Sequence, residues 1–119
     1  MEQIIDDEGR MDALRKSAEA RRCRADAMGW IYGTIKAGSS VSFAEVEGRY
    51  GSQDWFKRTK VERVFRAIPG IGTKTAPRVM SVLGLDRSKR VGGLGNRQMA
   101  SMASKFDELA SASAKRHMG

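Results

Sequence analysis

Cysteine, histidine and aromatic side chains are scarce in this sequence of 119 residues, and their scarcity excludes several classes of protein. The single cysteine, Cys23, has no second thiol for an internal disulfide, which fits a reducing compartment. His117 lies far along the chain from Cys23, so a Cys/His catalytic pair is not expected. No apolar run approaches the length of a membrane span, and the acidic first residues do not form a signal peptide. We therefore expect a cytoplasmic protein that makes no membrane contact.

Acidic residues are almost absent from the middle of the chain. Residues 57–97 hold eleven lysines and arginines but only two acids, Glu62 and Asp86, a net charge of +9. The rest of the chain, with eleven basic and twelve acidic residues, carries a net charge of −1. Such segregation of charge is typical of proteins that bind phosphate groups. Because this segment also lacks a carboxylate cluster for metal-assisted hydrolysis, we expect no enzyme activity, no metal and no cofactor.

A turn rich in proline and glycine interrupts the helical periodicity of this basic segment. Pro69 ends the preceding helix, and Ile71, which lies between two glycines, is expected to point inward. The backbone N–H groups of the glycines and of Thr73 then point outward beside the start of the next helix, an arrangement that binds phosphate. The candidate binding residues of this turn are Pro69, Gly70, Gly72, Thr73, Lys74 and Arg78.

Helical periodicity over most of the chain predicts an all-α fold with a helix-hairpin-helix type of turn. A proline-free stretch from residue 10 to about residue 37 predicts one helix of about 40 Å, longer than a small domain needs, so that part of it projects. Ser42 with Glu45, and Thr59 with Glu62, match the capping box that begins a helix, and Thr75 is the expected N-cap of the helix after the turn. The helix that follows Thr59 turns Lys60 toward water or a partner.

A second glycine turn precedes the last helix, which is expected to begin near residue 96. The basic loop before it contains Lys89 and Arg90. Backbone N–H groups of Gly93 and Gly95, together with Arg97 in the first helical turn, form a second predicted donor cluster. The two clusters would hold one nucleic-acid strand at two points.

The expected domain organisation is a single helical domain at residues 10–110. It lies between a disordered acidic N-terminus at residues 1–9 and a disordered tail, rich in serine and alanine, at residues 111–119. Tyr50 and Trp55 are expected to pack in the core rather than stack on bases, because neither has an aromatic partner that would form a platform.

The long N-terminal helix carries a basic cluster, Arg21, Arg22 and Arg24, that is nearly unopposed by acids. Two interpretations of this cluster remain open. It is either a solvent-exposed face with salt bridges or a surface that contacts a nucleic-acid backbone.

Four motifs in a fixed order resemble the actinobacterial (mycobacterial-type) integration host factor. They are residues 13–16 with 20–25, then 67–72, then 89–98 and finally 105–106. The resemblance runs from about residue 10 to residue 106. It implies a monomeric all-helical protein with a helix-two-turns-helix core like that of ribosomal protein S13. It also implies a nucleoid-associated protein that binds duplex DNA with little sequence preference, bends or compacts it, and assists site-specific recombination with a phage integrase or recombinase as partner.

The DNA contacts implied by the resemblance fall on Arg21, Arg22, Pro69, Gly70, Gly72, Lys74, Lys89, Arg90, Gly93 and Arg97. Three departures from the family pattern are visible. Thr73 stands where the family has a basic residue, Gly92 stands where it has arginine, and the segment 48–58 is longer and more aromatic. The first two departures predict weaker affinity, and the third indicates a divergent or phage-encoded relative.

Two other functions remain open from the sequence, and a helix-hairpin-helix repair enzyme is a more distant third. The S13-like core is also compatible with binding to structured RNA or to the ribosome. Alternatively, the long helix docks a recombinase and the chain acts as an adaptor whose DNA contact is incidental.

Overall fold

The computed structural model describes residues 2–118, with side chains from Glu8 onward, as an all-α protein, which confirms the expected fold class. The elements in chain order are α1 (Glu2–Lys36), α2 (Phe43–Tyr50), α3 (Asp54–Lys57), α4 (Val61–Arg66), α5 (Thr75–Val82), the 3₁₀ turn η1 (Val91–Gly93) and α6 (Asn96–Met118). An antiparallel bridge between Lys60 and Arg90 is the one β pairing recorded in these residues. None of the described helices has an apolar stretch long enough to span a lipid bilayer.

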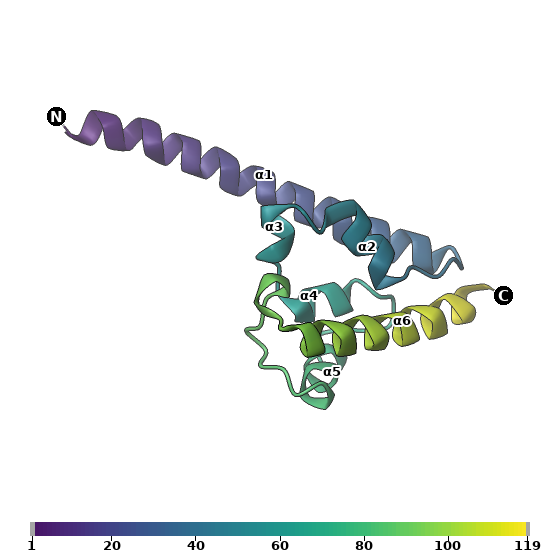
Figure 1. Cartoon of the computed structure of the whole chain (residues 1–119). Helices are drawn as coiled ribbons and strands as arrows, with labels where there is room; N and C mark the ends of the chain where they lie inside the picture. The colour runs from purple at the N-terminus through teal and green to yellow at the C-terminus, as the bar shows by residue number, and fades with distance from the viewer. Residues whose placement is uncertain (1, 119) are drawn as a thin grey trace.

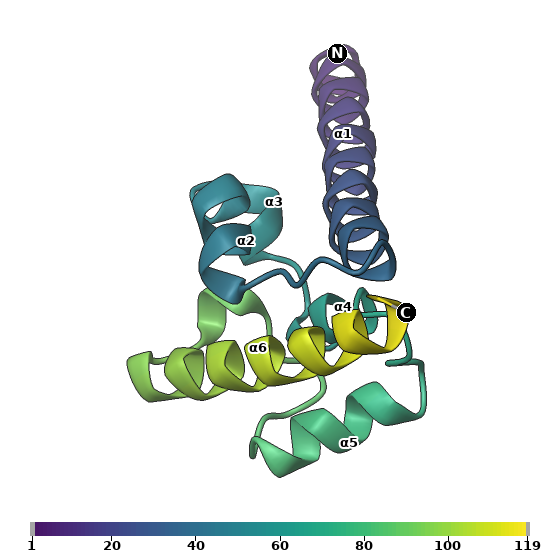
Figure 2. The same cartoon turned by 90° about the vertical axis from the view of Figure 1, so that its right-hand side faces the viewer.

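The helices are arranged around α4, which lies between α1 and α5 (Figure 1). Helix α6 runs across α4, and α2 and α3 pack to one side of α1 (Figure 2). The C-terminal end of α6 reaches the end of α1, where Met118 lies against Gly38. This arrangement places the turn between α4 and α5 near one end of α6 and the loop around η1 near the other end.

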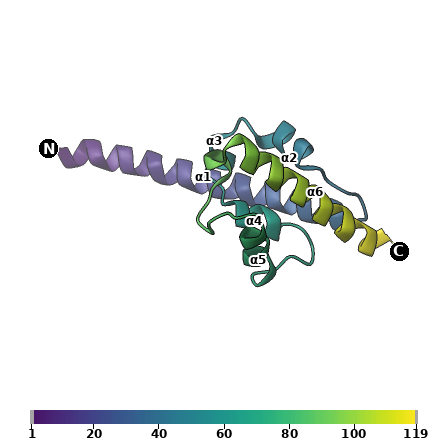
Figure 3. The ribbon, with the colours of Figure 1, turned by 60° about the horizontal axis from the view of Figure 1, so that its bottom comes forward.

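Only the second half of α1 belongs to the core. Ala27, Ile31 and Ile35 are fully buried, whereas Met11 and Leu14 in the first half are about 60% exposed. The first half extends beyond every other element, and the molecule measures 62 × 30 × 27 Å (Figure 3). The projection expected from the length of this helix is therefore present.

The start of α1 differs from the expected disorder at residues 1–9. The helix already begins at Glu2, while residue 1 lies outside the described residues. No proline interrupts these first turns, and acidic side chains favour a helix N-terminus through its dipole. Both features allow the helix to continue outward from residue 10.

Aromatic side chains fill the centre of the core. Phe106 on α6 contacts Phe43 and Phe65, with ring centroids 5.7 and 6.2 Å apart. Tyr50 and Trp55 pack against the buried Phe56 at 6.2 and 6.0 Å, which confirms the prediction that these two rings serve packing.

One of the three predicted helix caps is correct. Ser42 and Glu45 form the capping box at the start of α2, with both reciprocal hydrogen bonds present. The N-cap of α4 is Lys60 and not Thr59, and the N-cap of α5 is Lys74 and not Thr75; neither lysine side chain makes a capping bond. The Thr59 oxygen, which would act as the acceptor in a cap, instead accepts from Nε of Arg24 at 2.9 Å, while the hydroxyl donates to the carbonyl of Trp55 at 2.8 Å.

The predicted disordered tail at residues 111–119 is wrong for residues 111–118. Helix α6 continues to Met118, and Ser113 and Ala114 are buried. The Ser113 hydroxyl donates a 2.7 Å hydrogen bond to the carbonyl of Pro69. Serine and alanine are the residues that pack here because only small side chains let the helix approach the turn backbone so closely. Residue 119 lies outside the described residues.

Candidate nucleic-acid interface

The hairpin turn (residues 67–74) between α4 and α5 presents unpaired backbone donors to solvent. Gly70 is exposed with φ +95°, a left-handed conformation that glycine adopts without strain. The N–H of Ile71 donates to Ile68 at 3.0 Å, and the carbonyl of Gly72 accepts from Ala76 at 3.0 Å. Among the hydrogen bonds of the described residues, none uses the N–H of Gly70, Gly72 or Thr73. The expected donor cluster is therefore present at this turn.

The side chains of the hairpin turn separate into supporting and exposed groups. Pro69 is buried and Ile71 is half-buried against the core, so these two side chains anchor the turn to the core. Thr73, Lys74 and Arg78 are exposed at the start of α5. The turn thus combines free N–H groups with two cations at one helix start, which is favourable for an anion.

The second glycine turn (residues 92–95) differs from the prediction, because the N–H groups of Gly93 and Gly95, the two glycines of the predicted donor cluster, are already in use. Gly93 donates to the carbonyl of Arg90 at 2.9 Å, and Gly95 donates to the side-chain oxygen of Gln98 at 3.0 Å. The free donors of this region are instead the N–H groups of Asn96, Arg97 and Gln98, which open α6 and have no helical partner. Exposed Arg97 stays beside them, so the predicted site moves by one turn into α6.

The two donor clusters lie at opposite ends of α6. Asn96 opens this helix, and Ser113 contacts the hairpin turn through Pro69. Seventeen helical residues separate them, a distance of about 25 Å. On B-DNA, where phosphates of one strand advance about 3.4 Å along the axis per step, this distance corresponds to about seven steps. The clusters therefore do not hold neighbouring phosphates of one strand.

A depression lined almost entirely by cations lies beside α4, and we call it the basic hollow. Its volume is about 290 Å³, and no carboxylate lines it. The lining residues are Arg24, Arg58, Thr59, Lys60, Arg63, Arg66 and Arg90. Lys60 and Arg90 were predicted site residues, and the structure brings them together.

Backbone pairing holds the basic hollow in shape. The segment before α4 and the segment before η1 form the bridge between Lys60 and Arg90. On either side of it, the N–H of Val61 donates to the carbonyl of Lys89 at 3.0 Å, and the N–H of Val91 donates to the carbonyl of Thr59 at 2.9 Å. Lys60, Arg63 and Arg66 follow one another in steps of three along α4, whose last residue directly precedes the hairpin turn. A row of cations thus leads from the hollow to the hairpin.

Arg24 connects the long helix to this hollow. Its Nε donates to the hydroxyl of Thr59 at 2.9 Å, and its Nη2 donates to the carbonyl of Trp55 at 3.2 Å. Burial, together with the nearby charges of Arg63 and Arg90, lowers the pKa of the Arg24 guanidinium, which nevertheless remains charged at neutral pH. Crowding cations without a carboxylate is electrostatically unfavourable, and a bound anion relieves it.

The two acids of the basic segment are engaged elsewhere. Glu62 accepts from Arg87 at 2.9 Å, and this hydrogen bond lowers the pKa of the Glu62 carboxyl. Asp86 accepts from the Ser88 hydroxyl at 2.6 Å, which lowers the pKa of the Asp86 carboxyl. Neither carboxylate lines the basic hollow, but the nearby charges of Lys60 and Arg66 also lower the pKa of Glu62, so this acid offsets part of their positive charge.

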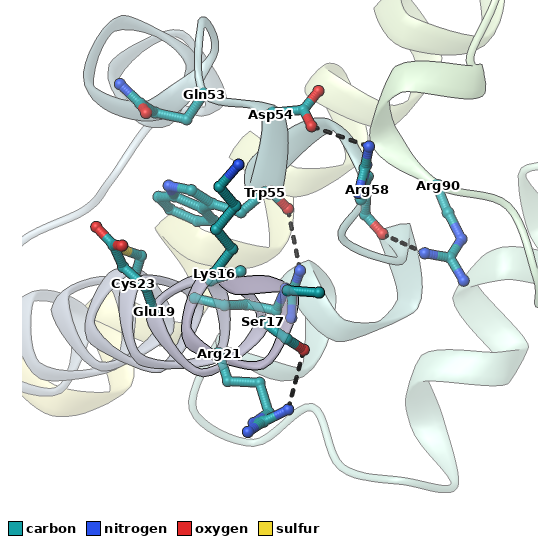
Figure 4. A pocket seen from close by; sticks show the side chains of 13 residues that line it. Lys16, Ser17, Glu19, Arg21, Cys23, Gln53, Asp54, Trp55, Arg58 and Arg90 are labelled. Atoms are coloured by element: carbon teal, nitrogen blue, oxygen red, sulfur yellow. Dashed lines mark hydrogen bonds and ion pairs between the residues drawn. The ribbon is translucent and has the colours of Figure 1, made fainter. Parts of the chain in front are cut away.

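A wider groove of about 720 Å³ runs between α1 and α3 and adjoins the hollow through Arg24, Arg58 and Arg90, which line both (Figure 4). Arg21 lies in this groove and donates to the Ser17 hydroxyl at 3.2 Å. Arg58 pairs with Asp54 at 3.1 Å, and its carbonyl accepts from Arg90 at 2.9 Å. Arg22 is exposed but lines neither depression. The basic cluster of α1 is thus divided, with Arg21 and Arg24 beside the interface.

Three arginines of the hollow, Arg58, Arg63 and Arg66, were not among the predicted site residues, and Arg24 was considered only as part of the basic cluster of the long helix. The i, i+3, i+6 spacing of Lys60, Arg63 and Arg66 on one short helix was a usable signal, because such residues lie along one side. The local cluster of arginines indicated Arg24 as a possible backbone contact, but its partner Thr59, which lies 35 residues away, could not be read from the sequence.

Comparison with known proteins finds one matching family and several similar proteins. Residues 36–106 match the family described as the S13-like H2TH domain. The chain is 36% identical over 104 residues to a protein of Streptomyces coelicolor named integration host factor, covering 87% of this chain and 92% of that protein. The protein of that name from Mycolicibacterium smegmatis is 31% identical, with 87% and 94% covered. A solved structure described as sIHF bound to an 8 bp palindromic DNA superposes with a TM-score of 0.66 at 33% identity, covering 77% of this chain and 98% of the other.

Proposed function

Because the chain belongs to the integration host factor family and carries its S13-like H2TH domain, we propose that it is an architectural protein that binds the phosphate backbone of double-stranded DNA with little regard to base sequence. The observation that carries the proposal is the basic hollow, which is lined by six cations and by no carboxylate, the one ion pair of these cations within the described part of the chain being that of Arg58 with Asp54. The DNA-bound state of the related structure supports the choice of duplex DNA as the partner.

The proposed contacts follow the row of cations. Lys60, Arg63 and Arg66 pair with phosphates next to the hairpin turn. The free N–H groups of the hairpin turn and of the first turn of α6 donate to phosphates about 25 Å apart. Contacts at that separation fall within one helical turn of the duplex, about 34 Å. A rigid protein that fixes two such points favours one curvature of the DNA between them, so we propose that binding bends or compacts the duplex.

The residues proposed to contact DNA are those of the hairpin turn, the row on α4 and the opening of α6, together with cations of α1 and of the segments after α3 and before η1. Besides the predicted Arg21, Lys60, Gly70, Gly72, Thr73, Lys74, Arg78, Lys89, Arg90 and Arg97, they include Arg24, Arg58, Arg63 and Arg66. Pro69 and Gly93 are proposed to shape the two turns, because Pro69 is buried and the N–H of Gly93 is occupied. The exposed Arg22 is proposed as a peripheral contact.

We propose a binding role without catalysis. Glu62 and Asp86, the acids nearest the interface in the sequence, are held by Arg87 and Ser88 and are not free to act as a base. We also propose that the protein is a monomer, that it associates with the nucleoid, and that an integrase or recombinase is its protein partner. The name of the related integration host factors supports the choice of partner. The apolar core, which is formed within one chain, supports the monomer.

The proposal predicts a steep dependence of affinity on salt. If about five phosphates are neutralised, the logarithm of the association constant should fall with the logarithm of salt concentration with a slope of roughly −4 to −5. Fluorescence anisotropy with a labelled random 20-mer duplex between 50 and 200 mM KCl measures this slope. A slope shallower than −2 would contradict backbone binding, and tighter binding of a structured RNA in competition would assign the interface to RNA.

Removal of a single cation should reduce the affinity for DNA duplexes of unrelated base sequence to the same extent. We expect Arg97→Ala and Lys89→Ala each to reduce affinity about three- to fivefold, which is the contribution of one solvent-screened charge contact. Gel shifts on three duplexes of different base composition test this expectation. A loss confined to one duplex would indicate that bases are read at that position.

A further inference from the structure

The last turns of α6 extend beyond the region that matches the S13-like H2TH family, which ends at residue 106. These turns are packed against the rest of the molecule. Ala110, Ser113 and Ala114 are buried, and the backbone at Met118 lies against Gly38 at the end of α1. The extension is therefore held at both the hairpin turn and the α1 terminus.

One side of this extension faces the hairpin turn. The buried Ser113 hydroxyl donates to the carbonyl of Pro69 at 2.7 Å, which fixes the position of α6 relative to the turn. Three residues later, on the same side of the helix, stands Arg116. A Cβ built on Gly70 would lie 3.2 Å from Nη2 of Arg116, so the guanidinium covers the Cα of this glycine.

The guanidinium of Arg116 has no acidic partner in the part of the chain that the structure describes. It lies instead next to Gly70, whose N–H is one of the free donors of the hairpin turn. The last turn of α6 favours a cation through the helix dipole, whereas the unpaired N–H groups of the hairpin repel one. An anion bound between the guanidinium and these N–H groups would satisfy both at once.

We propose that the extended end of α6 completes the phosphate site of the hairpin turn, with Arg116 as a DNA-backbone contact and Ser113 as the residue that positions it. This inference rests on the proposed function and adds a contact from outside the matched family region. The occupant is a phosphate of the duplex. The site combines the N–H groups of Gly70, Gly72 and Thr73 with charges from two helices, Lys74 before α5 and Arg116 on α6.

Lys115 offers a matched control for this contact. It has the same charge as Arg116 and is its neighbour in the chain, and it is also exposed. Because successive helical residues are about 100° apart, Lys115 points away from the face formed by Phe106, Ala110 and Ser113. Removal of either cation changes the net charge equally, but only Arg116 lies over the hairpin.

The test compares Arg116→Ala, Arg116→Lys, Lys115→Ala and Lys74→Ala in the full chain. We expect Arg116→Ala to weaken binding to a random duplex about three- to fivefold, as for one exposed charge contact, and to reduce the salt slope by about 0.9, as for one lost phosphate. Lys115→Ala should change affinity less than twofold, and Arg116→Lys should keep the salt slope. In two-dimensional NMR, the amide signals of Gly70 and Gly72 should shift less on addition of an 8 bp duplex in Arg116→Ala than in the unmodified protein.

Two outcomes would overturn the inference. If Arg116→Ala and Lys115→Ala behave alike while Lys74→Ala weakens binding, the hairpin contacts DNA without Arg116, and the proposed function stands. If Lys74→Ala also has no effect and the glycine amide signals do not move, the hairpin is not a DNA contact, and the proposed geometry fails together with this inference. Thermal unfolding of each variant checks that the fold is retained. Arg116→Lys keeps the positive charge, so it separates the effect of lost charge from the effect of lost packing.

Discussion

Replacement of Lys60 and Arg66 together by glutamate is expected to reduce the affinity for duplex DNA at least about 100-fold. Each reversal removes one attraction to a phosphate and adds one repulsion, an effect of about tenfold per residue in an interface held by charge. Both side chains line the basic hollow and are exposed, so the substitutions leave the apolar core intact. Fluorescence anisotropy at 100 mM KCl measures the loss, with circular dichroism as the check on helix content.

The control for this variant must carry the same change in net charge. Lys36→Glu with Lys115→Glu meets that requirement, because both lysines are exposed and lie outside the hollow. Its affinity should fall less than fivefold, as the long-range effect of net charge is screened within about 10 Å at this salt concentration. Equal losses in the two double variants would show that total charge, and not the hollow, determines binding.

Substitution of Gly72 by glutamate is expected to reduce affinity about 30-fold or more without lowering the melting temperature. Gly72 does not have a positive φ, and a Cβ built there has no atom within 4 Å, so the fold accepts a side chain. The new carboxylate would occupy the space in front of the free hairpin N–H groups and repel a phosphate. Each lost charge-assisted hydrogen bond contributes about 1.5 kcal/mol or more, roughly tenfold in affinity.

Two further glycine variants separate occlusion from backbone effects. Gly72→Ala should weaken binding only a fewfold, because it adds a methyl group and no charge. Gly48→Ala on α2, another glycine with open space around its Cα, should leave affinity unchanged. Both alanine variants should be as stable as the parent or more stable, since alanine reduces the conformational freedom of the unfolded chain. Unchanged affinity of Gly72→Glu would exclude the hairpin from the interface.

Features encoded by neighbouring residues were predictable from the sequence. Pro69 with Gly70 and Gly72 identified the hairpin turn, and Ser42 with Glu45 identified the start of α2. In both, the chemistry that decides the structure lies within three residues, so the pattern is sufficient. The concentration of positive charge in residues 57–97 likewise predicted where the basic hollow lies.

Features that depend on distant contacts were not predictable in this way. The hydroxyl of Thr59, a plausible cap by its spacing from Glu62, is engaged by Arg24 from α1. The end of α6 has the composition of a disordered tail, and its order depends on packing against Pro69 and Gly38. The separation of the two donor clusters follows from the length of α6 between them. These three features depend on residues that are far apart in the sequence, so a short sequence motif cannot indicate them.

The outer and inner halves of α1 are expected to differ in stability, because only the inner half is buried in the core. From Gly9 to Ser17 every side chain is exposed, so those turns depend on backbone hydrogen bonding and a few surface ion pairs such as Lys16 with Asp12. A solvated helical segment of this length has little intrinsic stability in water, whereas the turns from Ala27 to Ile35 unfold only with the core. The outer turns therefore melt and reform far more often than the protein unfolds. Any partner that bound along these turns would spend part of its binding free energy on ordering them.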